Sequence, residues 1–97
     1  MKTVFISYNQ ALKERVIEIL DRMSIRGFTM MDPVQGRGTK KGDPHYGDHA
    51  WPSLNGAIIT IIPAGKVDEL LRKLHDLDME REYLGLRAFV WNVEKIV

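Results

Sequence analysis

One segment, residues 56–62, constrains the fold more than any other because it is apolar on both faces of the strand that it predicts. Its sequence, GAIITII, is rich in β-branched residues and stops at Pro63, a pattern typical of a strand. Alternation places Ala57, Ile59 and Ile61 on one face and Ile58, Thr60 and Ile62 on the other. One layer of helices covers only one face of a sheet. The segment therefore predicts a sheet whose second face is covered by something else, most simply another copy of the chain.

The other patterned segments predict an order of elements around this strand. Val, Ile and aromatic residues mark strands, and apolar residues at helical spacing mark helices. The predicted strands are residues 2–8, 26–31 and 86–93, the second ending near Pro33, and the predicted helices are about residues 10–24 and 67–77. This order predicts an α+β, ferredoxin-like βαββαβ sandwich, with two helices on one face of a four-stranded antiparallel sheet.

Size and composition limit the classes of function. The 97 residues suit a single domain, residues 1–97, with a modest core that oligomerisation would help to stabilise. A net charge of +1 indicates no nucleic-acid partner, and the lack of cysteine excludes disulfides and thiolate metal sites. No apolar run approaches the roughly 18 residues of a membrane span, and the start of the chain resembles no signal peptide. We therefore expect a cytoplasmic protein without membrane insertion.

The candidate ligand-binding residues lie in a long loop, residues 34–55, and above all in residues 36–42, GRGTKKG. Glycines such as Gly36 and Gly38 let the backbone approach a ligand, and Arg37, Lys40 and Lys41 supply positive charge. Together they suit an anion, with phosphate first. The spacing matches neither a P-loop nor a dinucleotide fingerprint, and composition alone also allows a solvated surface loop.

A second constellation in the same loop suggests a metal. His45 and His49, with Asp43 and Asp48 beside them, are ligand types for Zn²⁺ or another divalent ion, although no third firm ligand is evident. The alternative is that these histidines lie at the surface or in an interface. No residue stands out as a general base, so an enzyme acting on a phosphorylated metabolite is the weakest hypothesis and we expect no catalytic residues.

Three motifs in order resemble the PII signal-transduction proteins of nitrogen regulation. The motifs are IRGFT at residues 25–29, GRGTKKG at residues 36–42, which resembles the root of the family's T-loop, and LRAFVWNV at residues 86–93, which resembles its last strand. The resemblance spans nearly the whole chain. It implies a homotrimer that binds ATP or ADP in clefts between subunits. It also implies a mobile T-loop, here about residues 36–55, that contacts a target protein such as a transporter or a metabolic enzyme.

The resemblance also assigns residues to the nucleotide site. By position, Gly27, Phe28 and Thr29 would lie near the adenine. The T-loop root, Gly36, Arg37, Gly38, Thr39 and Lys40, would approach the ligand, and Arg87 would take the place of a phosphate-binding lysine. Arginine keeps the charge at that position but presents a planar fork of donors.

The chain departs from the family's pattern in four places. Lys40 stands where the family has a glutamine, and residues 79–85 replace a glycine-rich turn. The T-loop is shorter, and the sequence stops at Val97 before the family's basic C-terminal strand. We therefore predict a divergent, non-enzymatic PII-like regulator that binds a small anionic effector, an adenine nucleotide first. The alternative is a divalent-metal-responsive trimer of the cation-tolerance type, with His45 and His49 as ligands.

Overall fold

The computed structural model describes residues 1–35, 54–81 and 84–97. The strands are β1 (Lys2–Asn9), β2 (Phe28–Val34), β3 (Asn55–Ile62) and β4 (Leu86–Asn92), and the helices are α1 (Lys13–Arg22) and α2 (Val67–Glu80). A short 3-10 turn precedes each helix, at Gln10–Leu12 and Ala64–Lys66. The order of elements is βαββαβ, as the sequence predicts.

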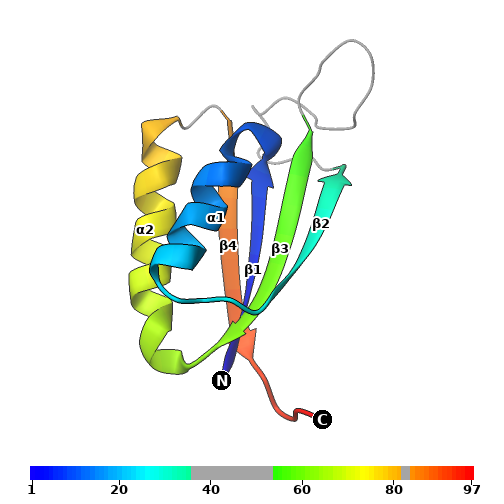
Figure 1. Cartoon of the computed structure of the whole chain (residues 1–97), viewed down its shortest axis with the longest axis vertical. Helices are drawn as coiled ribbons and strands as arrows, with labels where there is room; N and C mark the ends of the chain where they lie inside the picture. The colour runs from blue at the N-terminus through cyan, green and yellow to red at the C-terminus, as the bar shows by residue number, and fades with distance from the viewer. Residues whose placement is uncertain (36–53, 82–83) are drawn as a thin grey trace.

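The four strands form one antiparallel sheet in the order β2-β3-β1-β4, and both helices lie on the same face of it (Figure 1). The central pair is in continuous register, from Lys2 opposite Ile62 to Asn9 opposite Asn55. The predicted ferredoxin-like sandwich is therefore confirmed. Its two edges are β2 and β4, so residues on these strands lie at opposite sides of the sheet.

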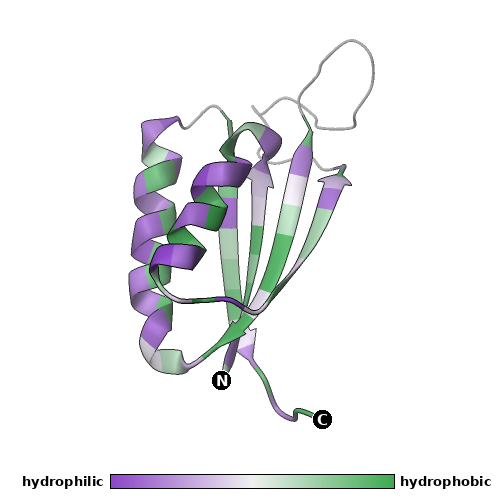
Figure 2. Cartoon of the chain, in the orientation of Figure 1, coloured by the Kyte–Doolittle hydropathy of each residue, from purple (hydrophilic) through white to green (hydrophobic). Residues whose placement is uncertain are grey.

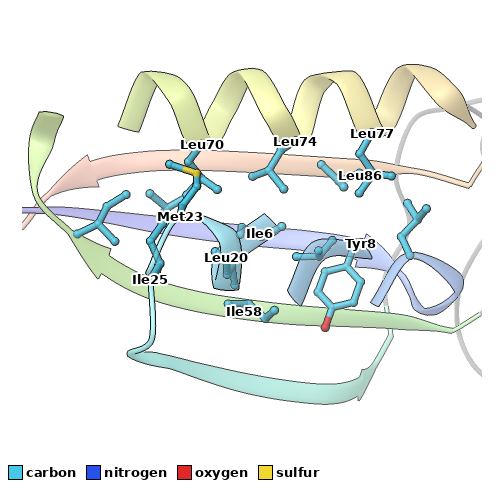
Figure 3. Packing of buried hydrophobic residues seen from close by; sticks show 14 of the residues in the cluster. Ile6, Tyr8, Leu20, Met23, Ile25, Ile58, Leu70, Leu74, Leu77 and Leu86 are labelled. Carbon is cyan, nitrogen blue, oxygen red and sulfur yellow. The ribbon is translucent and has the colours of Figure 1, made fainter. Parts of the chain in front are cut away.

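The core fills the space between the sheet and the helices (Figure 3). Figure 2 shows the hydrophobic side of each helix turned toward the sheet and hydrophilic residues on the outer side. This arrangement follows from the 3.6-residue period of the helices and the two-residue period of the strands. The most deeply buried members are Val4, Ile6 and Tyr8 of β1, Ile58 of β3, Val16 and Leu20 of α1, and Leu70 and Leu74 of α2.

Local polar contacts set the ends of α1. The side chain of Asn9 accepts a hydrogen bond from the Ala11 N–H at 2.9 Å, so it caps the 3-10 turn that leads into the helix. At the other end, Ser24 adopts a φ of 58° and reverses the chain. The Lys66 ammonium then donates to the Met23 carbonyl at 3.0 Å, which satisfies one of the last acceptors of the helix.

Strand β2 is longer than predicted. The sequence places its end near Pro33, whereas the strand continues through Pro33 to Val34. Proline is tolerated here because β2 is an edge strand and needs no N–H on its outer side. The register also shifts: Met31 lies opposite Ala57, but Val34 lies opposite Asn55, so β2 carries one extra residue between these pairs.

The face of the sheet that the helices leave open is apolar, as residues 56–62 predict. Ile61 is 46% exposed, Phe89 is 55% exposed and Trp91 is 49% exposed. The Phe5 and Trp91 rings stack on this face, with centroids 6.4 Å apart. We call Phe5, Ile59, Ile61, Phe89 and Trp91 the open-face cluster.

Among the described helices, none is long and apolar enough to cross a bilayer.

Candidate functional site

The structure describes four of the predicted effector-binding residues. Gly27 immediately precedes β2, Phe28 and Thr29 begin that strand, and Arg87 lies in β4. The predicted T-loop root, Gly36, Arg37, Gly38, Thr39 and Lys40, lies outside the described residues, as do His45 and His49. In residues 1–35, 54–81 and 84–97, no group of three or more His, Asp or Glu residues could hold a metal.

Thr29 and Arg87 share the open face but stand at opposite edges of the sheet. Thr29 of β2 lies opposite Ile59 of β3, and Ile59 lies opposite Phe5 of β1. Phe5 in turn lies opposite Phe89 of β4, so these four residues form one row across the open face. Arg87 is two residues from Phe89 and so has the same orientation. Three strand spacings separate the edges, which amounts to roughly 14 Å. One protomer therefore does not bring the two side chains to one small ligand.

Phe28 and Gly27 make different contacts from Thr29. The Phe28 side chain is half-buried against the core, on the helix-covered face. Gly27 is exposed, and a Cβ at this position would meet no atom within 4 Å among the described residues. Its carbonyl accepts a hydrogen bond from the Thr60 hydroxyl at 2.6 Å, which fixes the start of β2 against β3. The backbone at Gly27 thus stays accessible to a ligand or to another subunit.

Arg87 also borders a groove between α2 and β4. The groove has a volume of about 220 Å³. Its lining comprises Leu71, Leu74, His75 and Asp78 of α2 and Leu86, Arg87 and Ala88 of β4. Leucine and alanine side chains form an apolar floor, and His75 and Asp78 of α2 border it, while the Arg87 side chain points to the open face of the sheet.

His75 and Asp78 were not singled out by the sequence analysis. His75 is exposed on α2 and borders the groove. The spacing of Leu71, Leu74, His75 and Asp78 follows the i, i+3, i+4, i+7 rule for one helix face. That signal was present in the sequence, but only the position of β4 beside α2 makes this face a lining.

A second polar cluster lies at the end of the sheet where β2 stops and β3 starts. We call Tyr8, Lys13 and Asp32 the β2-end cluster. Lys13 Nζ lies 3.0 Å from Asp32 Oδ2, which joins the first residue of α1 to β2. Burial, together with the nearby Asp32 carboxylate, raises the pKa of the Tyr8 hydroxyl above its ordinary value. The sequence reasoning assigned no role to these three residues, which come together only through the pairing of β1, β3 and β2.

These residues belong to a small α+β sandwich whose open sheet face is apolar. Candidate ligand-binding residues lie at both edges of that face. The chain belongs to the nitrogen regulatory protein P-II family, whose model matches residues 1–97. The resemblance seen in the three sequence motifs is therefore confirmed, and the protein is a member of a family of PII-like signal-transduction regulators.

Solved structures of PII-like proteins share the fold. CPII from Thiomonas intermedia K12, bound to ADP, AMP and bicarbonate, matches with a TM-score of 0.72 and 22% identity over 95% of this chain and 88% of that chain. Its complex with ADP and bicarbonate matches with a TM-score of 0.75 and 24% identity over 93% and 82%. A putative PII-like signaling protein from Thermus thermophilus matches with a TM-score of 0.69 and 24% identity over 95% and 85%. No curated protein matches the chain.

Proposed function

We propose that this chain is a non-enzymatic regulator whose trimer binds an adenine nucleotide in the clefts between subunits. One observation carries the proposal: Thr29 and Arg87 lie on the same open face but at opposite edges of one sheet. When copies associate through that face, Thr29 of one copy can approach Arg87 of the next. The nucleotide would then bind only to the assembled protein.

The open-face cluster supports association through this surface. Three large hydrophobic side chains, Ile61, Phe89 and Trp91, are each about half exposed in the single chain. A contiguous apolar patch of this kind marks an interaction surface. A second and a third copy would remove the patch from water, which is the main driving force for stable homo-oligomers.

The solved relatives suggest which ligands to test. One CPII structure contains ADP, AMP and bicarbonate, and another contains ADP and bicarbonate. We infer that this protein takes ADP or AMP and that a small oxyanion such as bicarbonate binds beside the nucleotide. Arg87 would face the phosphates, and Gly27 and Thr29 would lie near the base. The Arg37 and Lys40 side chains would add charge from the T-loop root.

Within this proposal, residues 1–97 form one PII-like domain, and the T-loop-like segment, about residues 36–55, contacts a target protein. Ligand binding at the root of this segment would change which surface it offers to the target, a transporter or a metabolic enzyme. A role in nitrogen regulation is part of the same proposal, because it is the role that gives the family its name.

Isothermal titration calorimetry tests the proposal. We expect ADP and AMP to release heat with a stoichiometry of one nucleotide per chain, and bicarbonate to change the affinity. Arg87→Gln should weaken nucleotide binding at least tenfold, because it removes a charge-assisted hydrogen bond to a phosphate. Arg72→Gln is the matched control, since Arg72 is an exposed arginine of α2 outside the groove. No heat with ADP, AMP or ATP would refute the nucleotide proposal.

A further inference from the structure

Two buried polar atoms of the β2-end cluster lack partners. The Tyr8 hydroxyl and Asp32 Oδ1 are both inaccessible to water, and neither makes a hydrogen bond to any of the described residues. The other carboxylate oxygen, Oδ2, pairs with Lys13. A phenol that can donate and a carboxylate oxygen that can accept thus stand in the same cluster, each without a partner in the described part of the chain. Buried polar groups are nearly always satisfied, so this pair calls for an explanation.

Gly56 directs the Tyr8 ring toward Asp32. The two strands pair Tyr8 with Gly56, and a Cβ at Gly56 would lie 2.6 Å from the Tyr8 hydroxyl oxygen and 2.7 Å from two ring carbons. The tip of the ring therefore lies directly over the Gly56 backbone, pointing across β3 (Figure 3). The next strand beyond β3 is β2, which carries Asp32 on the same helix-covered face. The absence of a side chain at Gly56 gives the tip of the Tyr8 ring its place over β3.

Asp32 lies where the ladder holds β2 least firmly. The register shift falls between Met31 and Val34, so Asp32 and Pro33 have no paired residue on β3. Bulges of this kind re-aim a side chain locally. The Asp32 side chain is 12% exposed, that of its partner Lys13 is 38% exposed and Tyr8 is 1% exposed, so the ion pair lies toward solvent and the phenol lies in the core.

We propose that Asp32 alternates between two partners, Lys13 on the outer side and the Tyr8 hydroxyl on the inner side, and that the end of β2 takes a different position with each. In the outer position, which the structure shows, Oδ2 pairs with Lys13 and the phenol has no hydrogen-bond partner in residues 1–35, 54–81 and 84–97. In the inner position, the Tyr8 O–H donates to Oδ1. No proton is transferred, because the phenol stays neutral and the carboxylate stays ionised in both positions.

The consequence concerns the segment that follows β2. Val34 is the last residue of the strand, and Gly36 begins the cationic motif two residues later. A shift at Asp32 therefore moves Val34, the last residue of the strand before this motif in the sequence. Asp32 acts as a positioning residue for the end of β2, through Lys13 of α1 and Tyr8 of β1.

Chemical shifts of the ligand-free protein test this inference. Tyr8→Phe removes the inner partner and Lys13→Met removes the outer one. We expect the Val34 and Asn55 amide signals of the unsubstituted protein to lie between those of the two variants, on one line. Relaxation dispersion should detect exchange on the microsecond to millisecond timescale at these amides, and Tyr8→Phe should abolish it.

Thr60→Val is the matched control, because it removes a buried hydroxyl that holds the other end of β2. It should leave the exchange at Val34 unchanged. Signals that fall at either end of the line or off it would overturn the inference, as would exchange that persists in Tyr8→Phe. An ordered water, or any third group, bridging the Tyr8 hydroxyl to Asp32 would also overturn it. The measurements need no nucleotide, so their failure is distinct from failure of the proposed function.

Discussion

At the scale of single residues, Gly56 and Tyr8 form one unit of packing. Tyr8 is 1% exposed although it carries a polar hydroxyl, and its ring occupies the space that a side chain at position 56 would fill. Glycine in a strand interior usually weakens the strand, and here close approach of another group explains it. The large residue on β1 and the missing side chain on β3 are therefore complementary.

Gly56→Ala should lower the free energy of unfolding by about 1–3 kcal/mol, the usual cost of overpacking a filled site. The added Cβ would meet the Tyr8 ring at 2.6–2.7 Å, which forces the ring to move. Gly65→Ala is the control, because a Cβ there meets no described atom within 4 Å. Urea unfolding measures both. Equal effects of the two substitutions would contradict the packing argument.

The raised pKa of the Tyr8 hydroxyl predicts a dependence of stability on alkaline pH. Burial first, and the Asp32 charge second, favour the neutral phenol in the folded state, so the folded pKa lies above the unfolded value of 10.0. Below pH 10 both states keep the proton and this contribution is fully present. Above pH 10 the unfolded chain loses the proton first, so stability falls until the folded pKa is passed.

The difference in unfolding free energy between the unsubstituted protein and Tyr8→Phe isolates this effect. It should be constant below about pH 9 and should change above pH 10, with a limiting slope of about 1.4 kcal/mol per pH unit. The unsubstituted protein is the one that loses stability. Denaturant unfolding at several pH values measures it, and parallel curves through pH 11 would show that Tyr8 is not responsible.

At the scale of elements, apolar packing rather than surface charge holds α2 on the sheet. Leu70, Leu74 and Leu77 of α2 are almost completely buried. The ion pair that links α2 to α1, Arg15 with Glu80 at 3.1 Å, is about half exposed on both sides. Exposed pairs contribute little because water and salt screen them. The helices are therefore placed by their apolar faces.

Two substitutions in α2 should separate these contributions. Leu74→Ala should cost about 2–5 kcal/mol, because it removes buried methyl groups and leaves a cavity. Glu80→Gln should cost less than about 1 kcal/mol, since it breaks an exposed pair only. Thermal and urea unfolding compare them directly. A loss of similar size in the two variants would mean that the interhelical ion pair matters more than its exposure suggests.

At the scale of the whole molecule, a single chain leaves the apolar open-face cluster exposed to water. The helices bury one face of the sheet, and the cluster on the other face includes a stacked aromatic pair, Phe5 and Trp91. The same face carries Thr29 and Arg87 at its two edges. Association of copies through this face would bury the cluster and complete the proposed ligand site in one step.

Phe89→Glu should therefore convert the proposed trimer to a monomer and abolish nucleotide binding together with it. Phe89 is 55% exposed in the chain, so the substitution leaves the monomer's core intact. In an assembly, the substituted side chain would place an unpaired carboxylate in an apolar interface. Analytical ultracentrifugation measures the oligomeric state and circular dichroism the fold. Lys73→Glu, a charge change on α2, is the control that should remain trimeric.

The sequence alone determined most of the fold, because periodicity depends only on neighbouring residues. The double apolar pattern of residues 56–62 predicted an uncovered face, and the helical spacing of apolar residues predicted the two helices that cover the other face. The end of β2 was predicted too early, because the tolerance for Pro33 depends on β2 being an edge strand. Edge position is a property of strand order, which local patterns do not specify.

The tertiary structure decided how the candidate site residues relate to one another. Motif resemblance named Thr29 and Arg87 as parts of one site, but only strand order places them on one face at opposite edges. The β2-end cluster likewise depends on tertiary contact, since Tyr8, Lys13 and Asp32 come from three different elements. The sequence gives a side chain's neighbours along the chain directly. Its partners across a sheet depend on the pairing of strands that are far apart in the sequence, and only the tertiary structure determines that pairing.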